Sequence, residues 1–373
     1  MDKNNRLRLC CPCHFGLESV LKFEVTRIGG EDIRVTDGRI TFSGGEDILA
    51  RANLCLATAE RVLIELAEFR AESFEELFQG VKSIELERFI GRDDAFPVKG
   101  YSLDSKLHSV PDCQSIIKKA AVERLKEKYG IGWFSEEGAK VQIQFSILKD
   151  IVTVYLDTSG AGLHKRGYRR NSNAAPIKET LAAGIADLAH IRSGSSVCDP
   201  FCGSGTILIE SAFKALHIPP GINRRFSAEK WECTSQEVWR EERSRAIDGV
   251  DRSCTFEAVG YDIDDEAVAL TTDNAKKAGI SSRIKVYQQD IAKFRHPEGS
   301  IVICNPPYGE RLLELREAED IYRTMGRVLG KGGGTPSFII SPHEQFEALF
   351  GAKARKRRKL YNGMMKCQLF MYF

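Results

Sequence analysis

The sequence predicts an α/β protein in which a doubly wound, mostly parallel sheet follows two smaller α/β modules. Helix and buried-strand patterns alternate from residue 177 onward, which is typical of a parallel sheet with helices on both faces. Two shorter successions of strands and helices precede it, at residues 1–60 and 61–160. The last two strand patterns, 358–363 and 366–373, are joined by a tight turn, so an antiparallel hairpin should finish a seven-stranded sheet.

The first module is expected to follow the order strand, helix, strand, strand, helix. Apolar residues recur at helical spacing in 16–28, and Gly29-Gly30 ends that helix. Asp37-Gly38 separates two short strand patterns, as in a two-residue hairpin turn. The expected elements are a helix at 16–28, strands at 33–35 and 39–42, and a helix at 45–56.

The other two modules continue the alternation on either side of a polar, basic segment at 161–176, interpreted as a linker. In the second module we expect strands at 61–69, 96–103, 141–148 and 151–157, with Lys149-Asp150 as the last turn, and helices at 73–81 and 112–129. In the third we expect helices at 177–189, 206–216, 266–279 and 321–329, and strands at 196–199, 257–262, 284–290, 301–305 and 337–341.

Composition narrows the class of protein. The 373 residues include 42% hydrophobic residues, enough for a sizeable core. With 54 Lys and Arg against 52 Asp and Glu, the formal net charge is +2, so any nucleic-acid site must be local. No segment contains the uninterrupted stretch of about 18 apolar residues that a membrane-spanning helix needs. The 11 cysteines and an N-terminus unlike a signal peptide favour a reduced, cytoplasmic protein.

A glycine-containing loop lies between the strand at 196–199 and the next helix. Its glycines allow the backbone to turn against a ligand, and the helix offers free N–H groups at its positive end. The loop lacks the third glycine of the dinucleotide fingerprint, and Asp199 at the strand tip would repel a pyrophosphate. The pattern therefore excludes a nicotinamide-dependent dehydrogenase and favours a cationic cofactor such as S-adenosylmethionine. The candidate residues are Asp199, Pro200, Phe201, Gly203, Ser204, Gly205 and Thr206.

Two further strands end in carboxylates. Asp262, beside Ile263, is placed to accept hydrogen bonds from both ribose hydroxyls of the cofactor, and Asp290 from its adenine amino group. Because the carboxyl ends of parallel strands share one edge, these residues and Asp199 should line one crevice. Asp264 and the residue after it are interpreted as helix caps.

Asn305, Pro306, Pro307 and Tyr308 follow the fourth parallel strand and are the candidate catalytic residues. An exocyclic amine of a purine is a poor nucleophile, because its lone pair is delocalised into the ring. The Asn305 side-chain oxygen and the Pro306 carbonyl can each accept one N–H and turn the amine toward a methyl donor. The prolines fix the backbone, and Tyr308 offers a face for the base to stack on.

These motifs identify a family resemblance. The pair DPFCGSGT (199–206) and NPPYGER (305–311) resembles the class I, adenosylmethionine-dependent amino-methyltransferases. The whole chain resembles the THUMP-domain RNA methyltransferases, especially the bacterial group that makes N2-methylguanine in 23S ribosomal RNA and often carries the name N6-adenine-specific DNA methylase. The matching segments are CHFGLESVLKFE (13–24), GLHKRGYR (162–169), NAAPIKETLAAG (173–184), PPGINRRFSAEKW (219–231) and RKRRKLYNGMMKCQ (355–368).

The resemblance implies a domain organisation. It implies a ferredoxin-like domain at 1–60, a THUMP RNA-binding domain at 61–160, the linker at 161–176 and a Rossmann-like class I methyltransferase domain at 177–373. It also implies that Thr180 packs on the methionine end of the cofactor. Many ribosomal members have a second methyltransferase domain that this sequence does not show, which leaves the exact guanine open.

Clusters of basic residues are the expected RNA contacts. Cations there would bind phosphates, with salt-dependent affinity and without reading sequence. The candidates are His164, Lys165, Arg166, Tyr168, Arg169 and Arg170 in the linker, Arg224, Arg225 and Trp231 in an insertion, and Lys356, Arg357 and Arg358 before the final hairpin.

Several alternatives remain open at the level of the residues. The Asn305 motif also suits adenine N6 in DNA or RNA, a guanine in transfer RNA, or a protein glutamine amide. A non-catalytic RNA-binding factor would keep the same fold. Cys10, Cys11, Cys13 and His14 lack a second pair of ligands at zinc spacing, so no metal site is expected.

Overall fold

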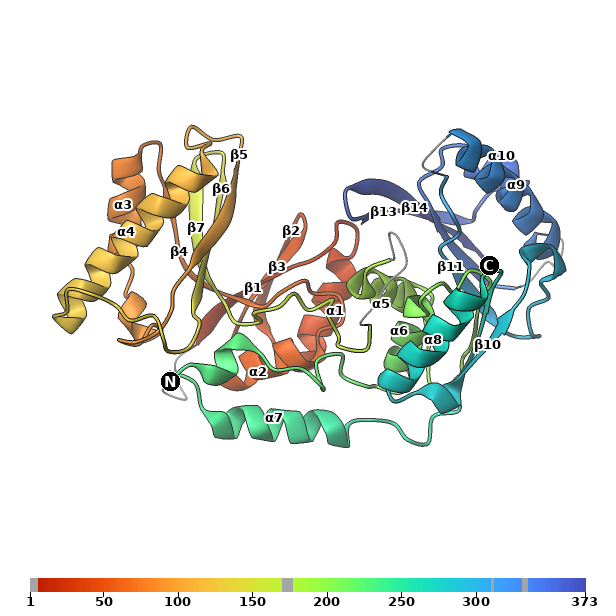
Figure 1. Cartoon of the computed structure of the whole chain (residues 1–373), viewed down its shortest axis with the longest axis horizontal. Coiled ribbons are helices and arrows are strands. Elements are labelled where there is room, and N and C mark those ends of the chain that lie inside the picture. The colour runs from red at the N-terminus through yellow and green to blue at the C-terminus, as the bar shows by residue number, and fades with distance from the viewer. Residues whose placement is uncertain (1–5, 170–176, 310–311, 331–334) are drawn as a thin grey trace.

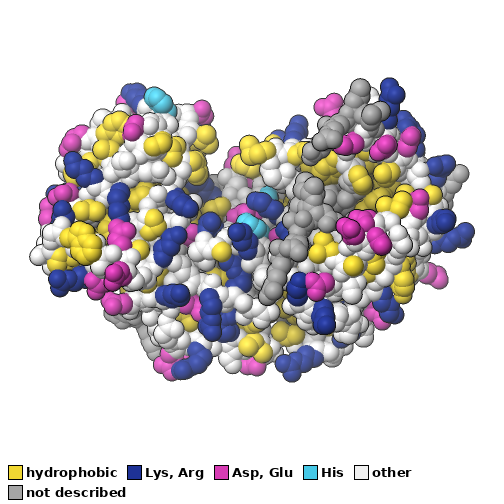
Figure 2. All heavy atoms as spheres, in the orientation of Figure 1, with side chains coloured by type: hydrophobic (Ala, Val, Ile, Leu, Met, Phe, Trp, Pro, Cys, Tyr) yellow, Lys and Arg dark blue, Asp and Glu magenta, His cyan; other side chains and the backbone are white. Residues whose placement is uncertain are grey.

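The computed structural model describes residues 6–169, 177–309, 312–330 and 335–373. The chain forms two lobes joined through a central region (Figure 1), and Figure 2 shows the molecule hollowed between the lobes along its upper edge. Among the helices in these ranges, none is both long and apolar enough to cross a membrane.

A seven-stranded sheet in the order β2-β3-β1-β4-β7-β6-β5 forms the N-terminal half. The sequence predicts two separate modules, but β1 pairs antiparallel with β4, with Leu9 opposite Ile64, so their strands are continuous. The strands are β1 (Leu7–Pro12), β2 (Glu31–Thr36), β3 (Arg39–Gly44), β4 (Leu63–Arg70), β5 (Val98–Leu103), β6 (Gln142–Leu148) and β7 (Ile151–Asp157). The helices are α1 (Glu18–Ile28), α2 (Glu46–Cys55), α3 (Phe74–Lys82) and α4 (Val110–Tyr129).

The predicted turns of this half are confirmed, and backbone geometry explains them. Gly29 ends α1 at φ 92°, a left-handed conformation that glycine adopts without steric cost. Lys149 and Asp150, between β6 and β7, both have positive φ, at 52° and 63°. Two consecutive left-handed residues form the turn that matches the twist of a tight hairpin.

The C-terminal lobe has the predicted Rossmann-like methyltransferase fold. Its sheet has the order β10-β9-β8-β11-β12-β14-β13, parallel except for β14, which is antiparallel to both neighbours. The strands are β8 (Ser196–Asp199), β9 (Glu257–Asp262), β10 (Ile284–Gln288), β11 (Ile301–Cys304), β12 (Ser337–Ser341), β13 (Lys356–Asn362) and β14 (Met365–Tyr372). The helices are α5 (Glu179–Leu188), α6 (Thr206–Ala215), α8 (Asp265–Lys277), α9 (Leu312–Leu329) and α10 (Phe346–Phe350).

An insertion between α6 and β9 connects the two halves. It contains α7 (Gln236–Asp248), a helix that the sequence analysis missed. Glu242 on α7 accepts two hydrogen bonds from Arg51 on α2, at 2.7 and 2.8 Å. Trp231, expected to contact RNA, is 1% exposed and belongs to the N-terminal core. The insertion therefore packs the methyltransferase lobe against the first module.

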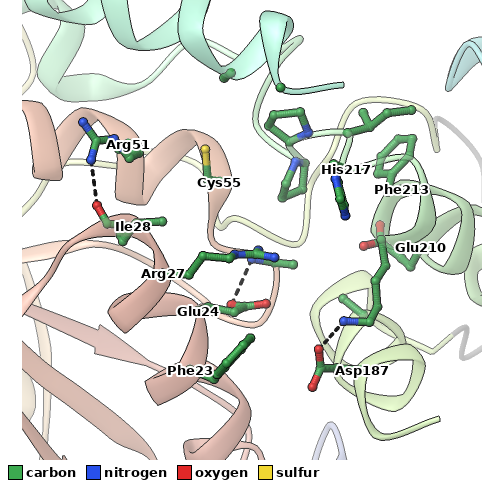
Figure 3. A pocket seen from close by; sticks show the side chains of 18 of the residues that line it. Phe23, Glu24, Arg27, Ile28, Arg51, Cys55, Asp187, Glu210, Phe213 and His217 are labelled. Carbon is green, nitrogen blue, oxygen red and sulfur yellow. Dashed lines mark hydrogen bonds and ion pairs between the residues drawn. The ribbon is translucent and has the colours of Figure 1, made fainter. Parts of the chain in front are cut away.

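The seam between α1, α2, α5 and α6 encloses a cavity of about 350 Å³ (Figure 3). On one side, buried Glu24 accepts hydrogen bonds from the backbone N–H of Ala57 and from the N–H and hydroxyl of Thr58. On the other, Lys214 forms an ion pair with Asp187. Glu24, Asp187 and Lys214 thus find partners at this seam.

Candidate active site

A cavity of about 590 Å³ opens at the carboxyl ends of β8, β9 and β11. The chain continues from β8 to β9 and from the adjacent β11 to β12, toward opposite edges of the sheet, and such sheets bind ligands where the strand order reverses in this way. The volume lies within the range of about 300 to 1,000 Å³ of small-molecule sites. The cavity collects most of the predicted site residues: Asp199, Pro200, Phe201, Gly203, Ser204, Thr206, Asp262, Ile263, Asp290, Asn305, Pro306, Pro307 and Tyr308, together with Ile177.

The two loop glycines serve different purposes. Both have left-handed φ, 52° at Gly203 and 78° at Gly205. A Cβ on Gly205 would lie 2.7 Å from Cγ2 of Thr271, whereas a Cβ on Gly203 would meet nothing within 4 Å. Gly205 therefore allows α8 to pack close to the loop. Gly203 allows the turn and leaves open space beside its backbone, where a ligand can lie.

Asp199 is the buried carboxyl of the site. It is 1% exposed and accepts one hydrogen bond, from the backbone N–H of Phe201 at 2.9 Å. Burial, together with the nearby charge of Asp262, raises the pKa of Asp199 to about 8. In the part of the chain that the structure describes, no cation pairs with Asp199, so the site suits a cationic ligand group.

The other two carboxylates both line the cavity and stabilise the backbone. The two oxygens of Asp262 accept from the backbone N–H groups of Gly203 (2.9 Å) and Asp264 (3.1 Å). Asp290 accepts from the backbone N–H of Ala292 at 2.7 Å. Each carboxylate oxygen keeps a second lone pair for a ligand. The prediction that Asp264 caps a helix is confirmed, since it accepts from the N–H of Glu266 at the start of α8.

The segment after β11 is held by two tyrosines. Tyr322 on α9 donates its hydroxyl hydrogen to the Pro307 carbonyl at 2.9 Å. The Tyr308 hydroxyl donates to Oδ1 of Asn305, the oxygen expected to hold a substrate amine. The Tyr308 ring packs against the core of the lobe, and burial raises the pKa of its hydroxyl well above the ordinary value. The ring is therefore less available for stacking than the sequence analysis expects.

Thr180 lies in a buried cluster outside the lining of the cavity. Its hydroxyl donates to Glu60, a residue of the N-terminal half, and lies 3.3 Å from Nε2 of His14. Glu60 also faces Nδ1 of His164 at 3.5 Å and Nζ of Lys178 at 3.3 Å. Burial opposes ionisation of Glu60, but the hydrogen bonds from His14, His164 and Thr180 outweigh it and lower its pKa. The cluster fixes α5 against the first module.

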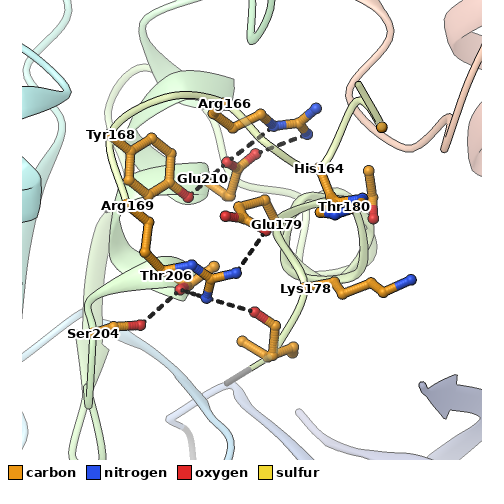
Figure 4. Close-up of polar contacts among 12 residues, drawn as sticks. His164, Arg166, Tyr168, Arg169, Lys178, Glu179, Thr180, Ser204, Thr206 and Glu210 are labelled. Atoms are coloured by element: carbon orange, nitrogen blue, oxygen red, sulfur yellow. Dashed lines mark hydrogen bonds and ion pairs between the residues drawn. The ribbon is translucent and has the colours of Figure 1, made fainter. Parts of the chain in front are cut away.

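Two of the four linker cations, Arg166 and Arg169, are structural, which corrects their expected role (Figure 4). Arg166 is 4% exposed and forms a two-pronged ion pair with Glu210 on α6, with both N–O distances at 3.3 Å. Tyr168 is buried and donates to the same carboxylate at 3.0 Å. Arg169 pairs with Glu179 at 2.9 Å and lies 3.3 Å from the Thr206 hydroxyl. Among the rest, Lys165 is exposed and Arg170 lies outside the described residues.

The other two basic clusters divide in the same way. Arg224 is 8% exposed and donates to the carbonyls of Gly162 and Ala161, and burial lowers its pKa to about 10. Arg225 is exposed and pairs with Glu229. In β13, Lys356 is exposed, Arg357 pairs with Glu347, and Arg358 donates to the Gly16 carbonyl and the Ser19 hydroxyl. The insertion and hairpin therefore retain few unpaired cations at the positions expected.

The cysteines near the N-terminus lie in the interior. Cys10, Cys11 and Cys13 are buried, and burial raises the pKa of each thiol. Within the described ranges, His, Cys, Asp and Glu side chains form no group suited to a metal ion.

Models of three protein families match successive parts of the chain. The RlmL ferredoxin-like domain matches residues 8–63, the THUMP domain 71–157, and the RMKL-like methyltransferase domain 166–370.

Individual proteins match over nearly the full length. YpsC of Bacillus subtilis (strain 168), provisionally named an RNA methyltransferase, is 40% identical over 361 residues, which cover 96% of this chain and 94% of YpsC. Ribosomal RNA large subunit methyltransferase K/L of Methylococcus capsulatus is 33% identical over 96% of this chain but only 50% of that protein. This chain thus corresponds to half of that longer relative.

Two solved structures also match nearly the whole chain. A structure described as a possible methylase from Clostridium difficile 630 is 42% identical, with a TM-score of 0.95. The match covers 99% of this chain and 98% of the chain in that structure. The structure of SMU.472 complexed with SAH is 36% identical, with a TM-score of 0.94. The match covers 100% of this chain and 99% of the chain in that structure.

Proposed function

Because this chain belongs to the RMKL-like methyltransferases, we propose that it transfers a methyl group from S-adenosylmethionine to the exocyclic N2 amine of a guanine in large-subunit ribosomal RNA. The THUMP domain and the relatives named for RNA support an RNA substrate. An enzyme acting on ribosomal RNA would work in the cytoplasm.

The residues of the cavity fit S-adenosylmethionine. The cofactor supplies an electrophilic methyl group on a sulfonium, and it also has an ammonium group and an adenosine. Asp199, which pairs with no cation among the described residues, would hold the ammonium. Asp262 keeps free lone pairs for the ribose hydroxyls, and Asp290 for the adenine amino group. The open space beside Gly203 accommodates a ligand against the backbone.

The observation that supports the chemistry best is the place of Asn305 in the cavity that also contains Asp199. Asn305 Oδ1 already accepts a hydrogen bond from Tyr308, so this oxygen is presented as an acceptor. A substrate amine would replace the Tyr308 hydroxyl there and donate its second N–H to the Pro306 carbonyl. Both N–H groups would then be held, and the nitrogen lone pair would point at the methyl group. The methylated amine loses its extra proton readily, so no strong general base is needed.

Methyl transfer to RNA in vitro tests this proposal. Ribosomal RNA from a strain lacking the protein should accept labelled methyl groups from S-adenosylmethionine, and digestion should release them as N2-methylguanosine. Label in N6-methyladenosine would favour the adenine alternative, and label in transfer RNA alone would change the RNA class. Absence of transfer to either RNA, with cofactor binding intact, would refute the proposal.

A further inference from the structure

The N-terminal sheet has one face without a helix layer of its own. Figure 1 shows α3 and α4 on the outer side of their lobe, while the other face of β5, β6 and β7 borders the hollow between the lobes. On β5, Lys99 and Tyr101 point to this exposed face, and Tyr101 is 43% exposed. Cys10, Leu63 and Tyr155 form a small separate cluster there.

Arg39 on β3 contributes a half-buried cation to this face. Its Nη1 donates to the Tyr155 hydroxyl at 3.1 Å, and it interacts electrostatically with Tyr101. Arg8 and Arg34, from the neighbouring strands, line a shallow cavity of about 390 Å³ on the N-terminal sheet. The face thus combines aromatic rings with guanidinium groups, which is the side-chain chemistry of nucleic-acid binding.

The turn next to Arg39 connects this face to the methyltransferase lobe. A Cβ placed on Gly38 would lie 3.3 Å from the ring of Phe15, which is 53% exposed. Phe15 in turn makes an edge-to-face contact with Tyr361 of β13, with ring centroids 5.9 Å apart. Nζ of the exposed Lys359 lies 5.3 Å from the Tyr361 ring centroid.

From Tyr361 the contacts lead into the reaction cavity. The next residue, Asn362, interacts with the Tyr308 hydroxyl, and that hydroxyl donates to Asn305. The hairpin is fixed beside Phe15, because Arg358 donates to the Gly16 carbonyl at 2.6 Å. Phe15, Tyr361, Asn362 and Tyr308 therefore lead from the Gly38 turn, at the edge of the exposed sheet face, to Asn305.

We propose that a single-stranded segment of the RNA substrate lies along this strip, defined as Tyr101, Arg39, Phe15, Lys359 and Tyr361, and delivers the target base to Asn305. Unpaired bases stack on aromatic faces, while lysine and arginine neutralise the phosphates between them. A base in a duplex is already stacked and must leave its helix to reach the cavity. This inference rests on the proposed function, which it extends by naming the conformation of the substrate and its path.

Substitution of the aromatic pair Phe15 and Tyr361, exposed and half-buried respectively, tests the strip. Binding of a fluorescent single-stranded RNA oligonucleotide, measured by anisotropy, should weaken about tenfold in Phe15→Leu and Tyr361→Leu, because leucine keeps the apolar volume but has no stacking face. Phe15→Tyr should bind like the wild type. Lys359→Ala should flatten the salt dependence of binding by about one phosphate contact. Phe23→Leu is a matched control, because Phe23 is 63% exposed but lines the seam cavity instead.

Methyl transfer separates failure of the strip from failure of the function. In Phe15→Leu we expect KM for RNA to rise about tenfold, with kcat and the affinity for S-adenosylhomocysteine unchanged. If the wild type methylates RNA and Phe15→Leu binds RNA as tightly as Phe15→Tyr, the strip is refuted and the proposed function stands. If the wild type methylates no RNA, the proposed function fails and the strip with it.

Discussion

Asp199→Asn should separate cofactor affinity from protein stability. In the free protein the pKa of Asp199 is about 8, because the carboxyl is buried and lies near the charge of Asp262. An ammonium group binds the ionised form, so below pH 8 binding must be accompanied by release of a proton. One pKa unit corresponds to a factor of ten in the equilibrium. The affinity for S-adenosylhomocysteine should therefore rise about tenfold per pH unit up to pH 8 and then level off.

Calorimetric titration with S-adenosylhomocysteine at pH 6, 7 and 8 measures the affinity and its pH dependence. Repeating it in buffers of different ionisation enthalpy counts the released protons, and about one is expected at pH 6. In Asp199→Asn the affinity should be lower at pH 8 and should lose this pH dependence, because an amide does not titrate. Asp264→Asn is a suitable control, since Asp264 caps α8 and does not line the cavity.

The stability of the free protein should change in the opposite direction. An acid whose pKa is higher in the folded than in the unfolded state holds an extra proton only when folded, so stability falls as pH rises from about 4 to 8. Asp199→Asn removes this loss, and its melting temperature without ligand should equal or exceed that of the wild type at pH 8. An affinity that is independent of pH in the wild type, or equally dependent in the variant, would refute the assignment.

Three further changes test other parts of the site. Asn305→Ala should abolish methyl transfer while leaving S-adenosylhomocysteine affinity within about twofold by calorimetry, and retained turnover would exclude the assigned role. Arg166→Ala should lower the free energy of unfolding by about 3 to 5 kcal/mol, because it removes the cation that pairs with the buried Glu210 carboxylate, without changing the salt dependence of RNA binding. Gly205→Ala should destabilise more than Gly203→Ala, for which left-handed φ alone costs about 1 to 2 kcal/mol, since only at Gly205 would the Cβ collide with a neighbour. Equal denaturant midpoints for the two glycine variants would contradict the packing argument.

The parts of the molecule that the sequence predicts depend on local signals. Asp199, Asp262 and Asn305 each lie at the end of a strand pattern, so the topology of a parallel sheet suffices to bring them to one edge. The turn at Lys149-Asp150 is likewise visible from two alternating patterns with a two-residue gap. The sequence predicts the carboxyl ends of β8, β9 and β11, and the two strand ends at this turn, to within about one residue.

The features that the sequence does not predict depend on partners far along the chain. The sequence indicates RNA contacts at Arg166 and Arg224 because it shows the charge of a residue but not its burial. The carboxylate that pairs with Arg166 is 44 residues away in the chain. The pairing of β1 with β4, which merges two modules into one sheet, has no local signal either. The sequence does not point to Arg39 and Phe15, because single cations and aromatic residues form a common surface only after folding.

Mass spectrometry of nucleosides tests the central claim most directly. Ribosomal and transfer RNA from a strain lacking the protein would be compared with RNA from the same strain complemented by the wild type or by Asn305→Ala. Loss of one N2-methylguanosine from large-subunit RNA, restored by the wild type alone, is the predicted result. Unchanged N2-methylguanosine, or restoration by Asn305→Ala, would contradict the account.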